Sequence, residues 1–323
     1  MAPPFLPDAA PLLSVVSPVY RGAAMLDELV QRLLAAVREL PGSCEIILVD
    51  DRSPDNAWAK IEELSQQHTE VRGVRLSRNF GQHRAIAAGL DHCRGQWVVV
   101  LDCDLQDRPE EIPRLWGHAQ QHGLDYVLAS RQDRQHGLGQ RLVSGAFYRV
   151  LRYLTGVPHD ASVANFGLYQ RRVIEAVQHM PERARFFPVM VRWVGFQGAT
   201  LPVAHAARSN GGSSYSWGRR LQLAFDVMLA WSDKPLRLAV QFGLLVTGLA
   251  FLLGLITLVR FWVGQISVPG YTSLVLLLCF FAGLIISLVG MVGLYVGRTF
   301  EEAKQRPVYL VDATTNRPDS VAP

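Results

Sequence analysis

The segment VLDCDLQDRPEEIP, which runs from Val100 to Pro113, ends an apolar run and then places three aspartates within six residues. If the chain stays extended here, Asp102 and Asp104 point to the same side, and Gln106 can join them. Two carboxylates this close repel each other unless a cation lies between them. Mg²⁺ suits such a pair, because it takes one or two protein carboxylates and completes its shell with water and substrate phosphates. The segment therefore indicates a metal-bound diphosphate ligand.

The alternative for this segment is an acidic, solvated turn between a strand and a helix. Asp107 is interpreted in that way, as a cap for the helix that PEEIPRLW begins. Asp102 and Asp104 follow VVVL directly, so the preceding strand should hold them close to the core. They are the residues for which we expect a site.

The residues around this segment alternate between apolar strands and amphipathic helices. Strands are expected at LLSVVSPVY (12–20), CEIILVDD (44–51), VRGVRLS (71–77) and WVVVLDCD (97–104), and helices over 25–40, about 57–68 and about 83–93. Apolar strands separated by helices predict a doubly wound, mostly parallel α/β sheet. Ligands of such sheets bind beyond the carboxyl ends of the strands, where Asp50, Asp51 and the Asp102–Asp104 pair fall. A dinucleotide-binding Rossmann domain is not favoured, because SPVYRGAAM lacks GxGxxG.

Composition excludes some classes of function. The 323 residues carry a formal net charge of +4, which is too weakly basic to indicate a nucleic-acid partner. The four cysteines show no metal-ligand spacing and are expected as reduced thiols. The N-terminal residues lack the basic start and apolar core of a signal peptide, so the following domain is expected to fold in the cytoplasm.

The C-terminal third contains two long apolar runs. Between Arg237 and Arg260 lie 22 uncharged residues, which as a helix would extend roughly 33 Å and could cross a membrane. A second span fits residues 272–296, and the flanking basic residues place both termini in the cytoplasm. Burial in a protein core is the alternative for these helices. The expected domains are a cytosolic catalytic domain (1–215), a juxtamembrane amphipathic helix (216–235), a transmembrane hairpin (236–297) and a cytosolic tail (298–323). The amphipathic helix could lie at the membrane interface or pack on the catalytic domain.

Four blocks carry a family resemblance. In chain order, SPVYRGAAMLDEL, EIILVDDRSPDNA, LSRNFGQHRAIAAGL and VVVLDCDLQDRPEEIP resemble the successive blocks of family 2 glycosyltransferases with the GT-A fold. With the two C-terminal spans, the chain is similar to the membrane-anchored polyprenyl-phosphate glycosyltransferases. That branch contains dolichol-phosphate mannose synthase and the bacterial undecaprenyl-phosphate glucosyl- and aminoarabinosyltransferases. The resemblance covers about residues 12–300.

The resemblance implies an activity and its setting. It implies inverting transfer of one sugar from a UDP- or GDP-linked donor to polyprenyl (undecaprenyl) phosphate, with Mg²⁺ or Mn²⁺ as cofactor. It also implies a multi-pass protein of the bacterial inner membrane, a catalytic domain in the cytoplasm, and a homo-oligomer. No histidine has to act as a base, because a phosphate monoester is largely dianionic near neutral pH. His83 is therefore expected to be structural or to donate a supporting hydrogen bond.

The resemblance also assigns roles to individual residues. The residues implied for the nucleotide sugar are Pro18, Tyr20, Asp50, Asp51 and Asp102. The residues implied for the metal are Asp102, Asp104 and Gln106. The residues implied for the acceptor phosphate are Arg131, Arg141, Ser144 and Arg208. The residues implied for catalysis are Asp102, Asp104, Arg131 and Arg141. Each arginine could instead be a solvated surface charge.

Some residues depart from the family pattern and leave the sugar open. Asn165 stands where an aspartate is common, and Cys103 replaces the usual alanine. Gly212 and Ser214 stand where relatives often carry glutamate and lysine.

Two other functions remain open at this point. One is a processive polysaccharide synthase of the same fold, which Arg192–Trp193 would suit, although Val189 stands where its QxxRW block needs glutamine. The other is a non-catalytic, membrane-anchored nucleotide-binding partner. The paired aspartates and the arginines argue against this second alternative.

Overall fold

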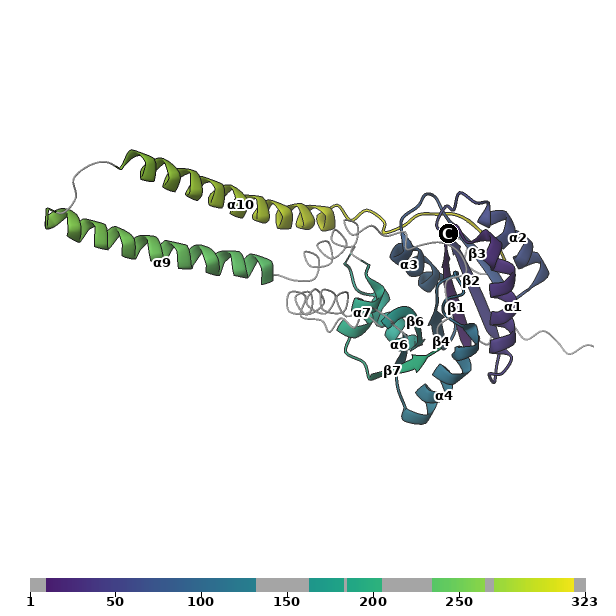
Figure 1. The fold of residues 1–323 in the computed structure, drawn as a ribbon. Coiled ribbons are helices and arrows are strands. Elements are labelled where there is room, and N and C mark those ends of the chain that lie inside the picture. The colour runs from purple at the N-terminus through teal and green to yellow at the C-terminus, as the bar shows by residue number, and fades with distance from the viewer. Residues whose placement is uncertain (1–9, 132–162, 183–184, 205–233, 265–269, 317–323) are drawn as a thin grey trace, which may run out of the picture. The chain divides into compact units, whose positions relative to one another are not determined.

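The protein is described here by a computed structural model, which covers residues 10–131, 163–182, 185–204, 234–264 and 270–316 (Figure 1). The chain divides into two compact units. The first holds the described residues before position 205 together with those from Arg306 onward, and the second holds residues 234–305.

The first unit is built on a mixed sheet. Within the described residues its strand order is β7-β5-β6-β4-β1-β2-β3-β8. The strands are β1 (Leu13–Val19), β2 (Cys44–Asp50), β3 (Val71–Leu76), β4 (Trp97–Val100), β5 (Tyr126–Arg131), β6 (Val163–Gln170), β7 (Gly198–Val203) and β8 (Val311–Thr314). Neighbours among β1–β4 pair in parallel, as do β5 and β7, whereas β6 is antiparallel to β4 and β5 and β8 is antiparallel to β3. The predicted α/β class with a mostly parallel sheet is confirmed.

Helices pack on this sheet (Figure 1), and the first four of them lie where the sequence predicted helices. They are α1 (Leu26–Val37), α2 (Ala57–Gln67), α3 (Gln82–His92), α4 (Ile112–His122), α6 (Arg171–Gln178) and α7 (Phe187–Trp193), with short 3-10 turns at Ala23–Met25 and Pro109–Glu111. In α1 the residues at helical spacing, Leu26, Leu29, Val30, Leu33 and Val37, are all buried. They share one core with alternate residues of β1, β2 and β4. Because β1 is buried along its whole length, its other face must also be covered.

Helix α3 covers that other face, and one glycine allows its close approach. A Cβ atom added to Gly89 would overlap the side chain of Val16 and lie 3.0 Å from Cγ2 of Val49. These valines belong to β1 and β2, so the backbone of α3 lies directly against the two central strands. This contact fixes the height of α3 over the sheet, and therefore the position of its first residue, Gln82.

The C-terminal residues 306–316, which we call the C-terminal strap, join the sheet. Their strand β8 pairs with β3, with Val74 opposite Thr314 and Arg75 opposite Ala313. These residues were expected to form part of a cytosolic tail, and no strand was predicted among them. A four-residue edge strand with half-exposed side chains carries too little apolar pattern to be seen in the sequence.

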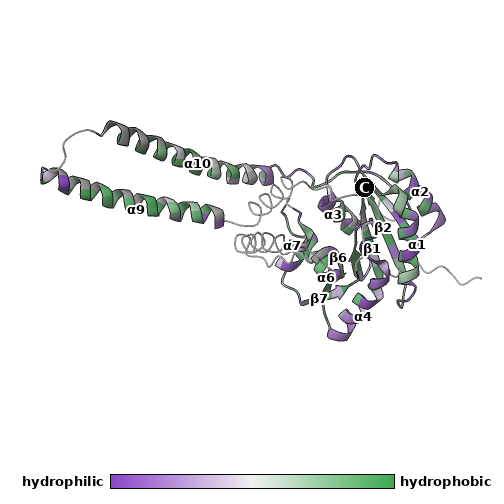
Figure 2. Cartoon of the chain, viewed as in Figure 1, coloured by the Kyte–Doolittle hydropathy of each residue, from purple (hydrophilic) through white to green (hydrophobic). Residues whose placement is uncertain are grey.

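The second unit contains two long helices, α9 (Lys234–Trp262) and α10 (Tyr271–Ala303). Figure 2 shows both to be rich in hydrophobic residues. Segments Leu236–Leu253 and Phe280–Ala303 are long and apolar enough to cross a membrane, and none of either segment is buried by the described chain. The alternative of a buried core helix is therefore not met in the described structure.

The Gly89 contact gives a stability prediction. Gly89→Ala should destabilise the protein by about 1–3 kcal/mol, because the added methyl group overpacks the core. Gly117→Ala is the matched control. Gly117 lies in α4, where a Cβ atom meets nothing within 4 Å, so this change should be neutral or stabilising by up to about 1 kcal/mol. Thermal unfolding of the full-length protein measures both effects, and equal Tm shifts in the two variants would contradict the close packing of α3.

Candidate active site

The end of β4 places Asp102 at the edge of the sheet. The amide of Leu101 still donates to the carbonyl of Val16 at 3.1 Å, so the chain stays bonded to β1 one residue beyond the strand. After Asp102 the chain turns, and Leu105 takes a left-handed conformation with a φ of 59°. The strand expected over residues 97–104 therefore ends at Val100, and its predicted extension to Asp104 was wrong. The turn is what gathers the aspartates here.

Asp102 is the focus of the site. Its Oδ1 accepts hydrogen bonds from Nε2 of Gln82 at 2.6 Å and from Nδ2 of Asn165 at 3.4 Å. Burial raises the pKa of Asp102 to about 6, the negative charges of Asp107 and Asp104 add to the rise, and the two amide donors oppose it. The free site is thus short of positive charge.

Asp104 and Asp107 lie close enough to act on Asp102 electrostatically. Oδ1 of Asp104 accepts from the backbone amide of Gln106 at 3.1 Å, which stabilises the turn. Asp107 is buried, with 2% of its surface exposed. The helix after it begins at Pro109 with Arg108 in the cap position, so the interpretation of Asp107 as the cap was wrong. It belongs with the acidic cluster instead.

The next acidic pair ends β2. Asp50 is buried, and its Oδ1 accepts from the amide of Ser53 at 2.8 Å. The two carboxylate oxygens of Asp51 accept from the amides of Phe80 and Gly81 at 2.7 and 2.9 Å. Burial raises the pKa of both aspartates, and these amide hydrogen bonds counteract the rise. Asp51 thereby ties the loop after β2 to the loop that leads into α3.

The loop after β1 completes this edge. Pro18 is a residue of β1 and pairs with Val49 of β2. Tyr20 follows the strand with 46% of its surface exposed, which leaves its ring accessible to a ligand. The amide of Arg21 donates to Oγ of Ser53 at 2.6 Å, so the loops after β1 and β2 are bonded to each other.

The comparisons with known proteins agree with this geometry. A family model described as glycosyl transferase family 2 matches residues 14–177, which hold all of the loops just described. The chain belongs to glycosyl transferase family 2. It is therefore a glycosyltransferase, and its fold is GT-A-like.

Individual relatives match nearly the whole length of this chain. Undecaprenyl-phosphate 4-deoxy-4-formamido-L-arabinose transferase of Klebsiella pneumoniae is 34% identical over 313 residues, covering 96% of this chain and 95% of that protein. The protein of the same name from Edwardsiella ictaluri is 36% identical over 316 residues, covering 95% and 96%. Among solved structures, glucosyl-3-phosphoglycerate synthase of Mycobacterium tuberculosis, bound to Mn²⁺, uridine diphosphate and phosphoglyceric acid, shares the fold with a TM-score of 0.51. It is 17% identical and covers 68% of this chain and 77% of its own.

The structure places only part of the expected acceptor site of the glycosyltransferase. Arg131 ends β5, whose carboxyl end lies at the same sheet edge as that of β4. One strand, β6, separates β5 from β4, so these two strands run roughly 10 Å apart, and Val100 of β4 and Leu128 of β5 both lie opposite Gly167 of β6. Arg141, Ser144 and Arg208 lie outside the described residues, as do the departures Gly212 and Ser214 and most of the expected amphipathic helix.

Two contacts to Asp102 were missed from the sequence. Gln82 is the first residue of α3, and Gly81 before it has a φ of 94°, which favours glycine. The block LSRNFGQHRAIAAGL contained both, but nothing in it pointed to an aspartate twenty positions later. Asn165 was noted only as a departure, and the structure shows its amide donating to Asp102. An aspartate at that position would instead add a further negative charge.

The remaining departure, Cys103, belongs to the hydrophobic core. It is buried, and a Cβ atom on Gly22 would lie 2.8 Å from its Sγ. The thiol therefore packs under the loop after β1. Burial raises its pKa to about 12, so it stays a neutral packing group.

The acidic cluster fits an ion that takes few protein ligands. Among the described residues no three or more histidine, cysteine, aspartate or glutamate side chains are arranged as a metal cage. Mg²⁺ and Mn²⁺ need only one or two carboxylates when water and substrate oxygens complete the shell. Burial, and after it the negative charges of Asp107 and Asp104, raise the pKa of Asp102, and a bound cation would offset both effects.

A stability measurement tests this electrostatic state. Without divalent ions at pH 7.5, Asp102→Asn should raise the Tm, because it removes a half-buried negative charge. The free energy of unfolding should increase by up to about 2 kcal/mol. The pKa of Asp102 is raised from 3.8 to about 6, so the charged form weakens the fold above pH 6. The difference in Tm between Asp102→Asn and the wild type should therefore shrink as the pH falls from 6 towards 4.

Asp27→Asn is the control for this measurement. Asp27 forms an exposed ion pair with Lys60 at 2.9 Å, away from the cluster. Loss of this ion pair should change the Tm little, both at pH 7.5 and near pH 4. A lower Tm for Asp102→Asn at both pH values would mean that the cluster is not repulsive.

Proposed function

We propose that the protein transfers a single sugar, with inversion, from a UDP- or GDP-linked donor to undecaprenyl phosphate or a related polyprenyl phosphate. The observation that carries the proposal is the end-to-end similarity to undecaprenyl-phosphate sugar transferases, which includes both apolar helices as well as the catalytic unit. A soluble transferase of the same fold would need no counterpart of α9 and α10.

Asp102 and Asp104 would hold Mg²⁺ or Mn²⁺, with Gln106 as a further ligand. The ion would neutralise negative charge on the diphosphate as it leaves the sugar. Support comes from the repulsion within the cluster, and from the Mn²⁺ bound with uridine diphosphate in the structure of the same fold. Gln82 and Asn165 orient Asp102, because both donate to its Oδ1.

The donor nucleotide would lie against the loops that follow β1 and β2. Pro18 and Tyr20 would contact the base, and Asp50 the ribose. Asp51 would act indirectly, since both its oxygens already bond the amides of Phe80 and Gly81. In this arrangement the donor would bind against loops that are hydrogen-bonded to one another and to the sheet.

The acceptor would need no strong general base, because its phosphate is largely dianionic near neutral pH. Burial lowers the pKa of His83 to about 4, so this histidine is neutral at pH 7 and its ring packs against Phe186. Direct attack by the phosphate on the anomeric carbon gives inversion. Arg131, Arg141, Ser144 and Arg208 would gather the acceptor phosphate and screen its repulsion from the diphosphate.

Helices α9 and α10 would form a hairpin in the bacterial inner membrane, with the catalytic unit and both termini in the cytoplasm. Lys234 and Arg237 lie at the start of the first apolar segment, and Arg298 and Lys304 lie at the end of the second. The amphipathic helix expected at residues 216–235 would lie at the membrane interface, and the protein would assemble as a homo-oligomer.

One experiment tests the proposal directly. Purified full-length protein is given polyprenyl phosphate, Mg²⁺ and a panel of UDP- and GDP-sugars that includes UDP-4-deoxy-4-formamido-L-arabinose, and products are analysed by mass spectrometry. One donor should yield a polyprenyl phosphate carrying a single sugar, and unphosphorylated polyprenol should yield none. Long polymer would favour a processive synthase, and nucleotide binding without any product would favour a non-catalytic partner.

The metal assignment has its own test. Asp104→Ala should lower the transfer rate by about 100-fold or more while the protein still folds, because the leaving diphosphate loses its charge partner. EDTA should stop the wild-type reaction, and Mg²⁺ or Mn²⁺ should restore it. Asp27→Asn again serves as the control. Substantial transfer by Asp104→Ala, or in EDTA, would overturn the assignment.

A further inference from the structure

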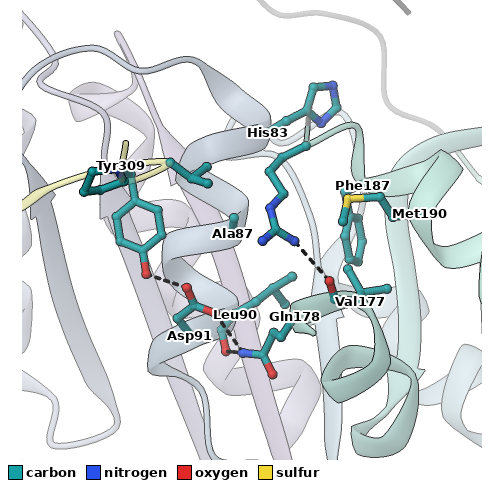
Figure 3. A pocket seen from close by; sticks show the side chains of 12 residues that line it. His83, Ala87, Leu90, Asp91, Val177, Gln178, Phe187, Met190 and Tyr309 are labelled. Atoms are coloured by element: carbon teal, nitrogen blue, oxygen red, sulfur yellow. Dashed lines mark hydrogen bonds between the residues drawn. The ribbon is translucent and has the colours of Figure 1, made fainter. Parts of the chain in front are cut away.

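The C-terminal strap is fastened to the first unit along its length. Oη of Tyr309 donates to Oδ2 of Asp91 on α3 at 2.5 Å, and Asp91 also accepts from Nε2 of Gln178 (Figure 3). Further on, the amide of Gly73 donates to Oγ1 of Thr315 at 2.7 Å. The strap is thus held at α3 and at β3. The residues between Tyr309 and Thr315 therefore lie in defined positions beside α3 and β3.

Asp312 is one of those residues, and it bonds two arginines. Its Oδ2 lies 2.8 Å from Nη1 of Arg52 and 2.7 Å from Nη2 of Arg75. Arg52 directly follows Asp51 and takes a left-handed conformation, with a φ of 54°. Such a conformation is unfavourable for a residue other than glycine, and surrounding contacts have to maintain it. The bond to Asp312 is one such contact on the Arg52 side chain.

The second arginine is held from two sides. The guanidinium of Arg75 lies 5.0 Å from the ring centroid of Trp58, in a cation–π contact, and pairs with Asp312. Arg75 and Arg52 both act to lower the pKa of Asp50, so their charges lie near the carboxylate expected to face the ribose. Asp312 therefore shares two cations with Asp50. Without Asp312, Arg52 and Arg75 would both lose a carboxylate partner, and Arg75 would keep its contact with Trp58.

The strap also holds the other loop of the donor side. The amide of Ser77 donates to the carbonyl of Leu310 at 2.9 Å, immediately after β3. That loop continues to Phe80 and Gly81, whose amides bind Asp51. Both loops that bear or anchor the acidic pair are therefore bonded to one short stretch, residues 310–312.

We propose that Asp312 is a positioning residue for the donor nucleotide, and that the C-terminal strap holds the loops after β2 and β3 in their binding arrangement. The inference rests on the proposed function, which assigns these loops to the nucleotide. The strap begins three residues after the end of α10, so the segment that leaves the apolar helix is also the segment that sets the nucleotide site. Exposed ion pairs contribute little to global stability, so the effect falls on loop position.

The test uses full-length protein and the probes UDP and GDP, each with Mn²⁺. For whichever nucleotide binds the wild type, Asp312→Asn should weaken binding by about 3- to 10-fold and raise the donor KM similarly, because Arg52 and Arg75 lose their partner. The KM for polyprenyl phosphate should stay unchanged, and the Tm should match the wild type. Asp312→Glu should restore binding, and Arg52→Gln should reproduce the loss. Asp27→Asn, which also breaks an exposed ion pair, should bind normally.

The outcomes separate this inference from the function beneath it. If the wild type binds nucleotide and transfers sugar, but Asp312→Asn binds equally well, the inference alone is overturned. If Asp312→Asn lowers the Tm and impairs donor and acceptor to the same extent, its role is merely structural and the inference is again overturned. If the wild type binds neither nucleotide, both the proposed function and the role of Asp312 that depends on it are contradicted.

Discussion

The repulsion among Asp102, Asp104 and Asp107, where the chain leaves β4, is the constraint around which the catalytic unit is organised. Strand β4 lies between β1 and β6, so Asp102 cannot move away without disturbing the core. Amides from Gln82 and Asn165 offset part of the charge. The remaining deficit suits a divalent cation that brings its own phosphate ligands. We propose that a donor and a metal ion bound together complete the site.

The loops around the cluster are positioned by charged side chains that bond backbone atoms and one another. Asp51 bonds two amides of the loop before α3, and Asp312 bonds Arg52 and Arg75. Because Asp312 and Leu310 lie far in the sequence from Arg52 and Ser77, the loops after β2 and β3 have contacts that form only when residues 310–312 are folded. Gly89 also contributes to the position of the site, because it lets α3 pack closely on β1 and β2 and so fixes the position of Gln82.

The features that follow from local pattern could be predicted from the sequence. Apolar strands and the spacing of α1 placed four parallel strands, their helices, and the aspartates at the strand ends. What depends on long-range contact could not be read there. Strand β8 is short and half-exposed, the turn at Leu105 breaks an apparently extended segment, and the contact from Gln82 to Asp102 spans twenty positions.

The functional residues divide in the same way. Asp102 and Asp104 follow from their place after a buried strand, whereas Asp107 was misassigned because its burial is a tertiary property. Roles for Pro18, Tyr20 and Arg131 came from family resemblance, since no local pattern distinguishes them from surface residues. Arg141, Ser144 and Arg208 lie outside the described residues, and their roles stay predictions.

We propose that the acidic cluster is a metal site completed by a nucleoside diphosphate. Electron paramagnetic resonance of Mn²⁺, titrated into the full-length protein with and without UDP or GDP, tests it most directly. Mn²⁺ should bind weakly alone and at least about tenfold more tightly with the matching nucleotide, because the protein supplies only one or two ligands. The gain should vanish in Asp102→Asn. Equal Mn²⁺ binding with and without nucleotide, or in wild type and Asp102→Asn, would contradict the claim.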